Sequence, residues 1–129
     1  MKKIILMAMV CLCAMQAMAS DKPSFIGKRS FNFGGVPAWH EGYELTMQKG
    51  GNMLLTKQGC STVGGCMPKK TLHKGKFKQL VRVNDEGHVY YIRLGKNQAY
   101  MLDANKKQEY GCNPATINND PCIGKYYRE

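Results

Sequence analysis

The sequence lacks the motifs of several common enzyme classes and the long apolar run of a membrane-spanning helix. It contains no Gly-x-Ser-x-Gly, no His-Glu-x-x-His and no phosphate-binding loop. Its longest apolar run, from Ile4 to about Met15, is shorter than the ~20 residues that a membrane-spanning helix needs. It has one tryptophan, and no repeat, low-complexity tract or linker. These absences favour a single small domain without catalytic residues, cofactor or metal.

The beginning of the chain has the pattern of a secretory signal peptide. Met1-Lys2-Lys3 is positively charged, the apolar run follows, and Ala17 and Ala19 are small residues at the positions that a signal peptidase recognises. We therefore expect cleavage after residue 19 and one domain over residues 20–129, exported to the bacterial periplasm or the extracellular space. Cleavage removes two lysines and no acid, so the formal net charge falls from +10 to +8.

Four cysteines follow the expected cleavage site: Cys60, Cys66, Cys112 and Cys122. An even number in an oxidising compartment predicts two disulfides, which four cysteines can form in three ways. The local pairing, Cys60–Cys66 and Cys112–Cys122, is favoured because each pair flanks a segment of turn-forming residues. The crossed alternatives close longer loops, so they would remove more conformational entropy from the unfolded chain and stabilise the folded protein more. A zinc site at Cys60, Cys66 and His73 is disfavoured by the five- and six-residue intervals between them.

Alternation of apolar and polar residues predicts an all-β domain of about eight short strands. Expected strands lie at 25–33, 43–48, 53–57, in three runs within 74–102, and at 107–110 and 123–128, with the last pairing with the first. No segment outside the leader has a helical period long enough to predict a helix. The sequence therefore predicts a small antiparallel β-barrel or sandwich of meander topology with two disulfides.

The inner face of this domain is expected to hold bulky side chains, namely Phe31, Phe33, Phe77, Tyr90 and Ile92. This prediction places Val83 opposite His88 across the Asn-Asp-Glu-Gly turn, and leaves open whether Met101, or Tyr100 with Leu102, points inward. A carrier of a small ligand needs a cavity. The bulky inner set therefore favours a filled core, although a carrier or an enzyme inhibitor remains the alternative function.

Positive charge is concentrated in one part of the chain. The forty residues between Glu44 and Asp85 contain no acid but hold eight cations. Period-two alternation places Lys74, Lys76, Lys78 and Arg82 on one face of a single strand, about 6.6 Å apart between neighbours, with Tyr91 and Arg93 beside them.

This basic face predicts binding of an anionic surface or partner. The expected partners are lipopolysaccharide, acidic polysaccharide, nucleic acid or an acidic protein. The other interpretation is a solvated face whose lysines keep strand edges from aggregating. The candidate binding residues are Lys69, Lys70, Lys74, Lys76, Lys78, Arg82, Tyr91 and Arg93.

The run from Tyr90-Tyr91-Ile92-Arg93 to Tyr100-Met101-Leu102-Asp103 resembles the small lipocalin-like β-barrel domains of bacterial envelope proteins, such as the amino-terminal domain of the lipoprotein NlpE. The resemblance implies a barrel fold. It implies no functional residues, because this chain lacks the Cys-x-x-Cys and the lipidated amino-terminal cysteine of that family.

Overall fold

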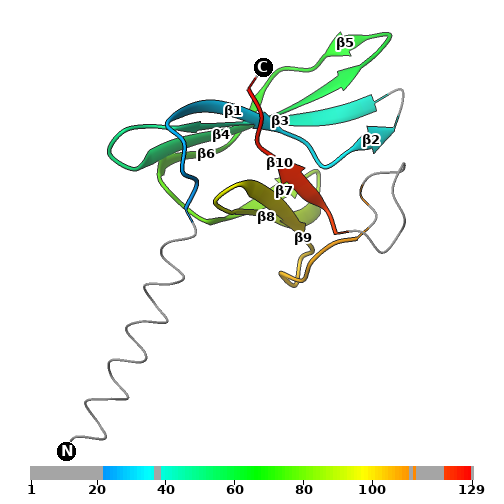
Figure 1. Cartoon of the computed structure of the whole chain (residues 1–129). Coiled ribbons are helices and arrows are strands. Elements are labelled where there is room, and N and C mark those ends of the chain that lie inside the picture. Colours follow the sequence, from blue (N-terminus) through cyan, green and yellow to red (C-terminus); the bar gives the residue numbers. More distant parts are fainter. Residues whose placement is uncertain (1–21, 37–38, 111, 113–120, 129) are drawn as a thin grey trace, which may run out of the picture.

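Two antiparallel sheets make up the computed structural model of the chain, which describes residues 22–36, 39–110, 112 and 121–128 (Figure 1). The six-stranded sheet contains β1 (Gly27–Phe31), β2 (Gly35–Val36), β3 (Trp39–Met47), β4 (Asn52–Ser61), β5 (Gly65–Cys66) and β6 (Lys70–Lys76). The four-stranded sheet contains β7 (Leu80–Asp85), β8 (His88–Leu94), β9 (Gln98–Leu102) and β10 (Ile123–Lys125). The described residues include no helix, so the all-β prediction is confirmed.

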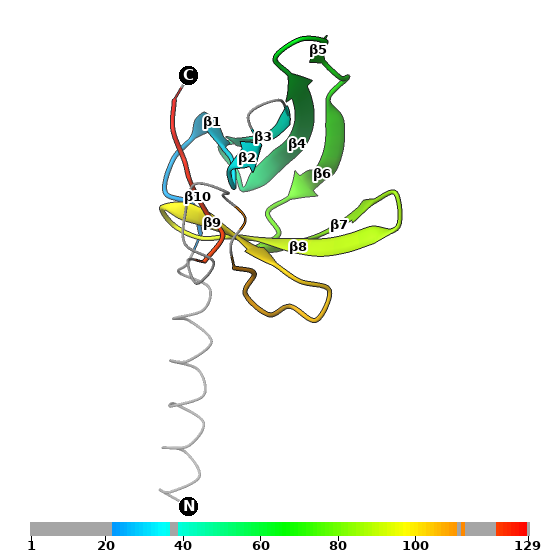
Figure 2. The same ribbon diagram turned by 90° about the vertical axis from the view of Figure 1, so that its right-hand side faces the viewer.

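The main strands follow one another as a meander. In the large sheet β1 pairs with β3, β3 with β4 and β4 with β6, and the small sheet runs β7-β8-β9-β10. After β10 the chain returns to the first strand, where Ser30 and Tyr127 exchange backbone hydrogen bonds of 2.8 and 2.9 Å. The strand ladder is interrupted between β6 and β7. The two sheets therefore enclose one core without closing into a continuous barrel (Figure 2).

The core lies between the sheets and is built from alternate residues of each strand. Its fully buried side chains include Phe31, Tyr43, Leu45, Met47, Met53, Leu55, Val83, Ile92 and Leu94. Burying a large apolar side chain contributes roughly 1.5–3 kcal/mol, so this set is the main source of stability. The expected inner residues are confirmed: four are buried, and Phe77 is partly buried against the same cluster.

Strand register in the small sheet differs from the prediction without changing which side chains face inward. Val83 lies opposite Tyr90 rather than His88, because Glu86 and Gly87 alone form the turn, with φ angles of 51° and 89°. A slip of two residues preserves the inner face, since side chains alternate with period two. On β9, the pairing of Leu94 with Ala99 directs Met101 toward the core, which settles the register left open by the sequence.

The prediction of one strand from Lys74 to Arg82 is wrong. β6 ends at Lys76, and the Phe77 N–H donates to the Gly51 carbonyl, 2.8 Å away, at the turn between β3 and β4. That bond anchors Phe77 where β4 begins, so the chain has no further partner in the large sheet. It crosses to the other sheet, where β7 begins at Leu80.

Three smaller predictions also need correction. The segment 39–42, expected as a loop, begins β3. Residues 107–110 form only isolated bridges, at Gln108 and Tyr110, instead of a strand. The last strand pairs with β9, and its only backbone bridge to the first strand among the described residues is that of Tyr127 with Ser30.

Both predicted disulfides are present. Cys60 and Cys66 are register partners on β4 and β5, and Cys112 joins the buried Cys122 beside β10. Two disulfides fit an oxidising compartment. The predicted signal peptide, residues 1–19, lies outside the described residues. Among the residues that are described, no helix has the length and apolar character to cross a membrane.

Candidate functional site

The eight predicted binding residues lie on both sheets, and the four cations expected on a single strand are divided between them and the connection from β6 to β7. Lys74 and Lys76 are exposed on β6, Lys78 is exposed in the connection that follows, and Arg82 is exposed on β7. Tyr91 and Arg93 are half-buried on β8. Within the described part of the chain, the first four of these cations make no ion pair.

The other two predicted lysines are already engaged. The Lys69 ammonium lies 2.9 Å from Glu44 Oε1, and Lys28 approaches the other oxygen of that carboxylate at 3.5 Å. The hydrogen bond from Lys69 holds the pKa of Glu44 below its usual range, against the opposing effect of burial. Lys70 donates to the Asn84 carbonyl at 3.1 Å and so links β6 to the end of β7. The charge of Lys69 is therefore partly balanced by Glu44, whereas Lys70 keeps its charge and is only held in place.

The outer face of the small sheet brings together arginine and tyrosine side chains. We call this set the Arg–Tyr face; it consists of Arg82, Tyr91, Arg93, Tyr100 and Lys106. Arg82 is the register partner of Tyr91, and Arg93 that of Tyr100. The Arg93 guanidinium carbon lies 4.3 Å from the centroid of the Tyr100 ring, and the Lys106 ammonium lies 5.4 Å from that of Tyr91.

Such cation–π contacts hold flexible cationic side chains in place against a rigid ring. The Tyr100 hydroxyl also accepts a hydrogen bond of 2.8 Å from the Gln98 side chain, which fixes the ring further. Tyr100 and Lys106 were not predicted as site residues. Alternation along the third run of the meander could have placed Tyr100 on the outer face, but only if the register between β8 and β9 had been known.

A second polar cluster joins the two sheets at the interruption between β6 and β7. The Lys57 side chain is only 8% exposed. Its ammonium lies 2.7 Å from Asp85 Oδ2 and 3.2 Å from Glu41 Oε2. It also donates to the Tyr90 hydroxyl at 3.2 Å, and that hydroxyl lies 2.9 Å from the hydroxyl of Tyr43. All five groups are thereby connected across the core.

This Lys57 cluster has the chemistry of a structural element rather than of a catalytic one. Burial lowers the pKa of Lys57, but hydrogen bonds from its ammonium to Asp85 and Tyr90 outweigh this and raise the pKa above its usual value. Burial raises the pKa of Tyr43, and the neighbouring Tyr90 hydroxyl raises it further. A lysine held protonated in this way is a poor nucleophile and a poor general base.

Lys57 is one of the eight cations between Glu44 and Asp85 that suggested a basic surface, but the structure buries it. The signal was present in the sequence, because the parity that places Met53 and Leu55 inward also places Lys57 inward. Glu41 and Asp85 both form ion pairs with this lysine. No group of three histidine, cysteine or acidic side chains suited to a metal ion occurs among the described residues.

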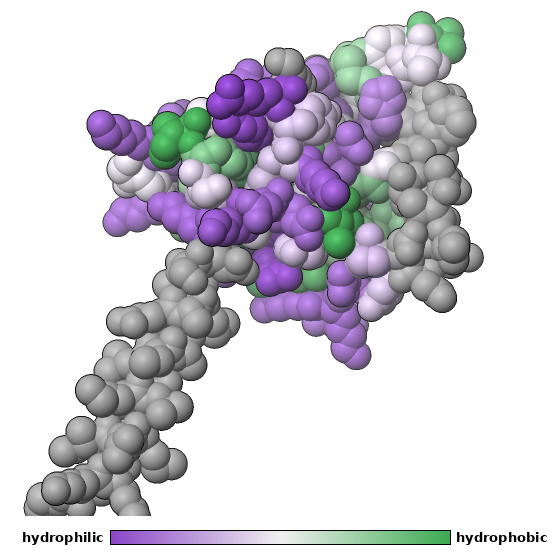
Figure 3. Space-filling view, in the orientation of Figure 1, coloured by the Kyte–Doolittle hydropathy of each residue, from purple (hydrophilic) through white to green (hydrophobic). Residues whose placement is uncertain are grey.

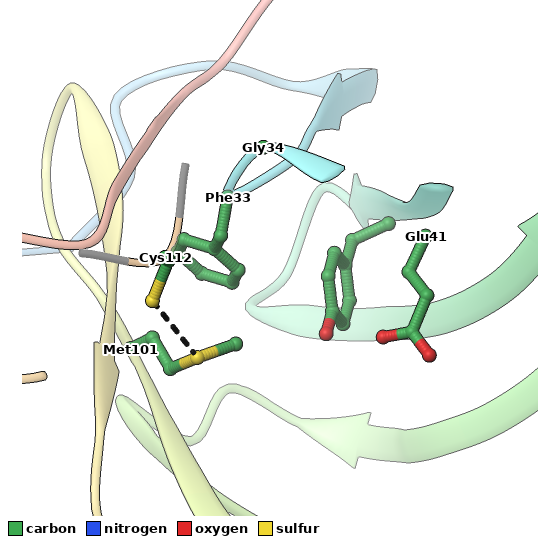
Figure 4. Close-up of a pocket in the computed structure, with 6 residues that line it drawn as sticks. Phe33, Gly34, Glu41, Met101 and Cys112 are labelled. Carbon is green, nitrogen blue, oxygen red and sulfur yellow. Dashed lines mark hydrogen bonds between the residues drawn. The ribbon is translucent and has the colours of Figure 1, made fainter. Parts of the chain in front are cut away.

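A small pocket of about 250 Å³ adjoins the cluster. It is lined by Phe33, Gly34, Glu41, Tyr43, Met101 and Cys112. Figure 4 shows Phe33, Met101 and Cys112 grouped at one end and Glu41 at the other; the Cys112 and Met101 sulfur atoms are 3.6 Å apart, a packing contact because Cys112 Sγ is bonded to Cys122. The volume is below the ~300–1,000 Å³ of ordinary ligand sites.

Comparison of the chain with known protein families, with curated proteins and with solved structures gives no match. The resemblance to the NlpE amino-terminal domain therefore stays a prediction.

Proposed function

We propose that this protein is an exported, non-enzymatic binding protein that holds an anionic polymer against its Arg–Tyr face. The observation that carries the proposal is the register of Arg82 with Tyr91 and of Arg93 with Tyr100 on one sheet face. Paired cations and rings recur there on adjacent strands, so a linear polyanion lying across the strands meets both pairs. The basic face expected on one strand is thus replaced by a face made of three strands.

The chemistry of the face suits phosphate, sulfate or carboxylate groups. Arginine presents several N–H donors in a planar arrangement and binds such groups through two parallel hydrogen bonds. The tyrosine rings add flat surface for sugar or base rings. The formal charge of +8 expected after cleavage of the leader adds a long-range attraction for polyanions.

Two observations disfavour the alternative of a ligand carrier. The interior is filled by aromatic and branched side chains, and the pocket beside Glu41 is small. Glu41 and Tyr43 at that pocket are also committed to the Lys57 cluster.

Binding to heparin and to DNA at several salt concentrations tests the proposal. We expect the Arg82→Gln/Arg93→Gln variant to bind about tenfold more weakly, and its dependence of log K on log salt for duplex DNA to be shallower by about 0.9 for each lost phosphate contact. Lys74→Gln/Lys76→Gln is the matched control, because it also removes two charges, from β6 of the other sheet. The proposal fails if the wild-type protein binds neither polymer at low salt, or if only the lysine variant loses binding.

A further inference from the structure

The β4–β5 hairpin ends in a tip that is both apolar and uncharged. Val63 at the tip is 93% exposed, and green hydrophobic surface marks this tip in Figure 3; Met67, just behind the disulfide, is 59% exposed. No residue from Gln58 to Pro68 carries a charge. The Cys60–Cys66 disulfide joins the two strands at the base of the turn. An exposed apolar tip is thus held on a rigid support.

Four backbone groups at and just behind the tip find partners within the hairpin. Ser61 Oγ accepts hydrogen bonds from the N–H groups of Val63 and Gly64, at 3.2 and 3.1 Å. The Met67 N–H donates to the Gly59 carbonyl at 2.8 Å, and the Met67 carbonyl accepts from the Gln58 side chain at 2.8 Å. Removal of the tip from water therefore leaves these groups satisfied, which is the main requirement for entering an apolar medium.

Two lysines directly follow the uncharged stretch. Lys69 and Lys70 lie near the level of Lys57 on β4, four residues from Ser61 and so about 13 Å behind the tip. A lipid headgroup layer is about 5–7 Å thick, and charges still attract one another over a Debye length of ~8 Å beyond it. With the tip at the inner edge of this layer, the lysines therefore lie within range of the lipid phosphates. Glu44 is the acid in contact with Lys69, and it is shared with Lys28, so positive charge remains in excess.

We propose that the β4–β5 tip docks the protein on an anionic lipid surface. Val63 enters the boundary between headgroups and acyl chains, Met67 lies farther back at the level of Gly59, and Lys69 and Lys70 face the phosphates. The disulfide and the Ser61 turn fix the loop beforehand, so little conformational entropy is lost on docking. The site is separate from the Arg–Tyr face, because Figure 2 places β5 and β9 at opposite ends of the molecule.

Sedimentation with lipid vesicles tests this proposal, using protein purified after expression of the full chain so that the cell carries out any processing. The vesicles are phosphatidylglycerol mixed with phosphatidylcholine, or phosphatidylcholine alone. We expect binding to the mixed vesicles only, a loss of about tenfold in Val63→Asp, and a gain in Val63→Phe. Val63 is so exposed that neither substitution affects folding, which circular dichroism verifies.

Ile26→Asp is the matched control, because Ile26 is 65% exposed but lies before β1. The proposal is overturned if the wild-type protein ignores anionic vesicles, or if Val63→Asp binds as well as wild type. It is also overturned if Ile26→Asp loses as much binding, or if Arg82→Gln/Arg93→Gln alone abolishes it, since the contact then belongs to the Arg–Tyr face. Heparin binding by Val63→Asp should stay at the wild-type level, so the two proposals fail independently.

Discussion

The ammonium of Lys57 lies 2.7 Å from the carboxylate of Asp85, and this pair connects β4 of one sheet to the end of β7 in the other. It stands where the strand ladder between β6 and β7 is interrupted, so side chains supply a link that backbone hydrogen bonds do not. The lysine is almost fully buried while Asp85 is 40% exposed. Removing one partner of such a pair destabilises the protein chiefly because the other charge stays buried with too few partners.

Asp85→Asn should lower the free energy of unfolding by about 1–3 kcal/mol, because Lys57 keeps only Glu41 as an ionic partner. Urea unfolding followed by circular dichroism measures this difference. Glu44→Gln is the matched control, since it removes a carboxylate bound to exposed lysines and should cost less than about 1 kcal/mol. Equal losses in the two variants would show that the Lys57 cluster does not link the sheets.

Acid should destabilise the protein in a defined direction. The pKa of Asp85 is lowered in the folded state, chiefly by its hydrogen bond from Lys57, and the pKa of Glu44 by that from Lys69. Below a pH of about 4 these two carboxylates bind protons in the unfolded chain but stay ionised in the folded chain. The stability that these carboxylates contribute is therefore complete above that pH and is lost as the pH falls through the lowered folded-state pKa values.

Urea midpoints recorded from neutral to acidic pH test this prediction. Asp85→Asn should start with a lower midpoint at neutral pH and then lose less of it on acidification than the wild-type protein does. Parallel curves for the two proteins would contradict the assignment of acid sensitivity to Asp85.

Gly124→Ala should destabilise the protein by about 1–3 kcal/mol, because the new methyl group has no room. An added Cβ there would lie 2.8 Å from the Asn32 carbonyl oxygen and 3.0 Å from the Phe31 ring. β10 would have to move away from the first strand. Gly42→Ala on β3 is the comparison, since nothing lies within 4 Å of its added Cβ and the change should be neutral or slightly stabilising. Thermal unfolding that ranks the two variants in the opposite order would contradict this packing.

Local patterns in the sequence predicted much of the fold. The alternation of Phe31 with Phe33 and of Tyr90 with Ile92 identified inner side chains correctly, because a strand has only two faces and water excludes one of them. Turn-forming residues between Cys60 and Cys66, and between Cys112 and Cys122, indicated the right disulfide pairing. The same reasoning failed at Phe77, since no local signal shows where one sheet runs out of partners and the chain must cross to the other.

The candidate sites were less predictable for the same reason. The sequence by itself determined most of the strands, the charge, and the alternation of inner and outer side chains within a strand, all of which depend on near neighbours along the chain. Only the tertiary structure decided that Lys57 is buried against Asp85, that Arg93 lies over Tyr100, and that Lys74 and Arg82 lie on different sheets. Each of these depends on which strands meet in space, and strand pairing is set by the burial of the whole core rather than by any single segment.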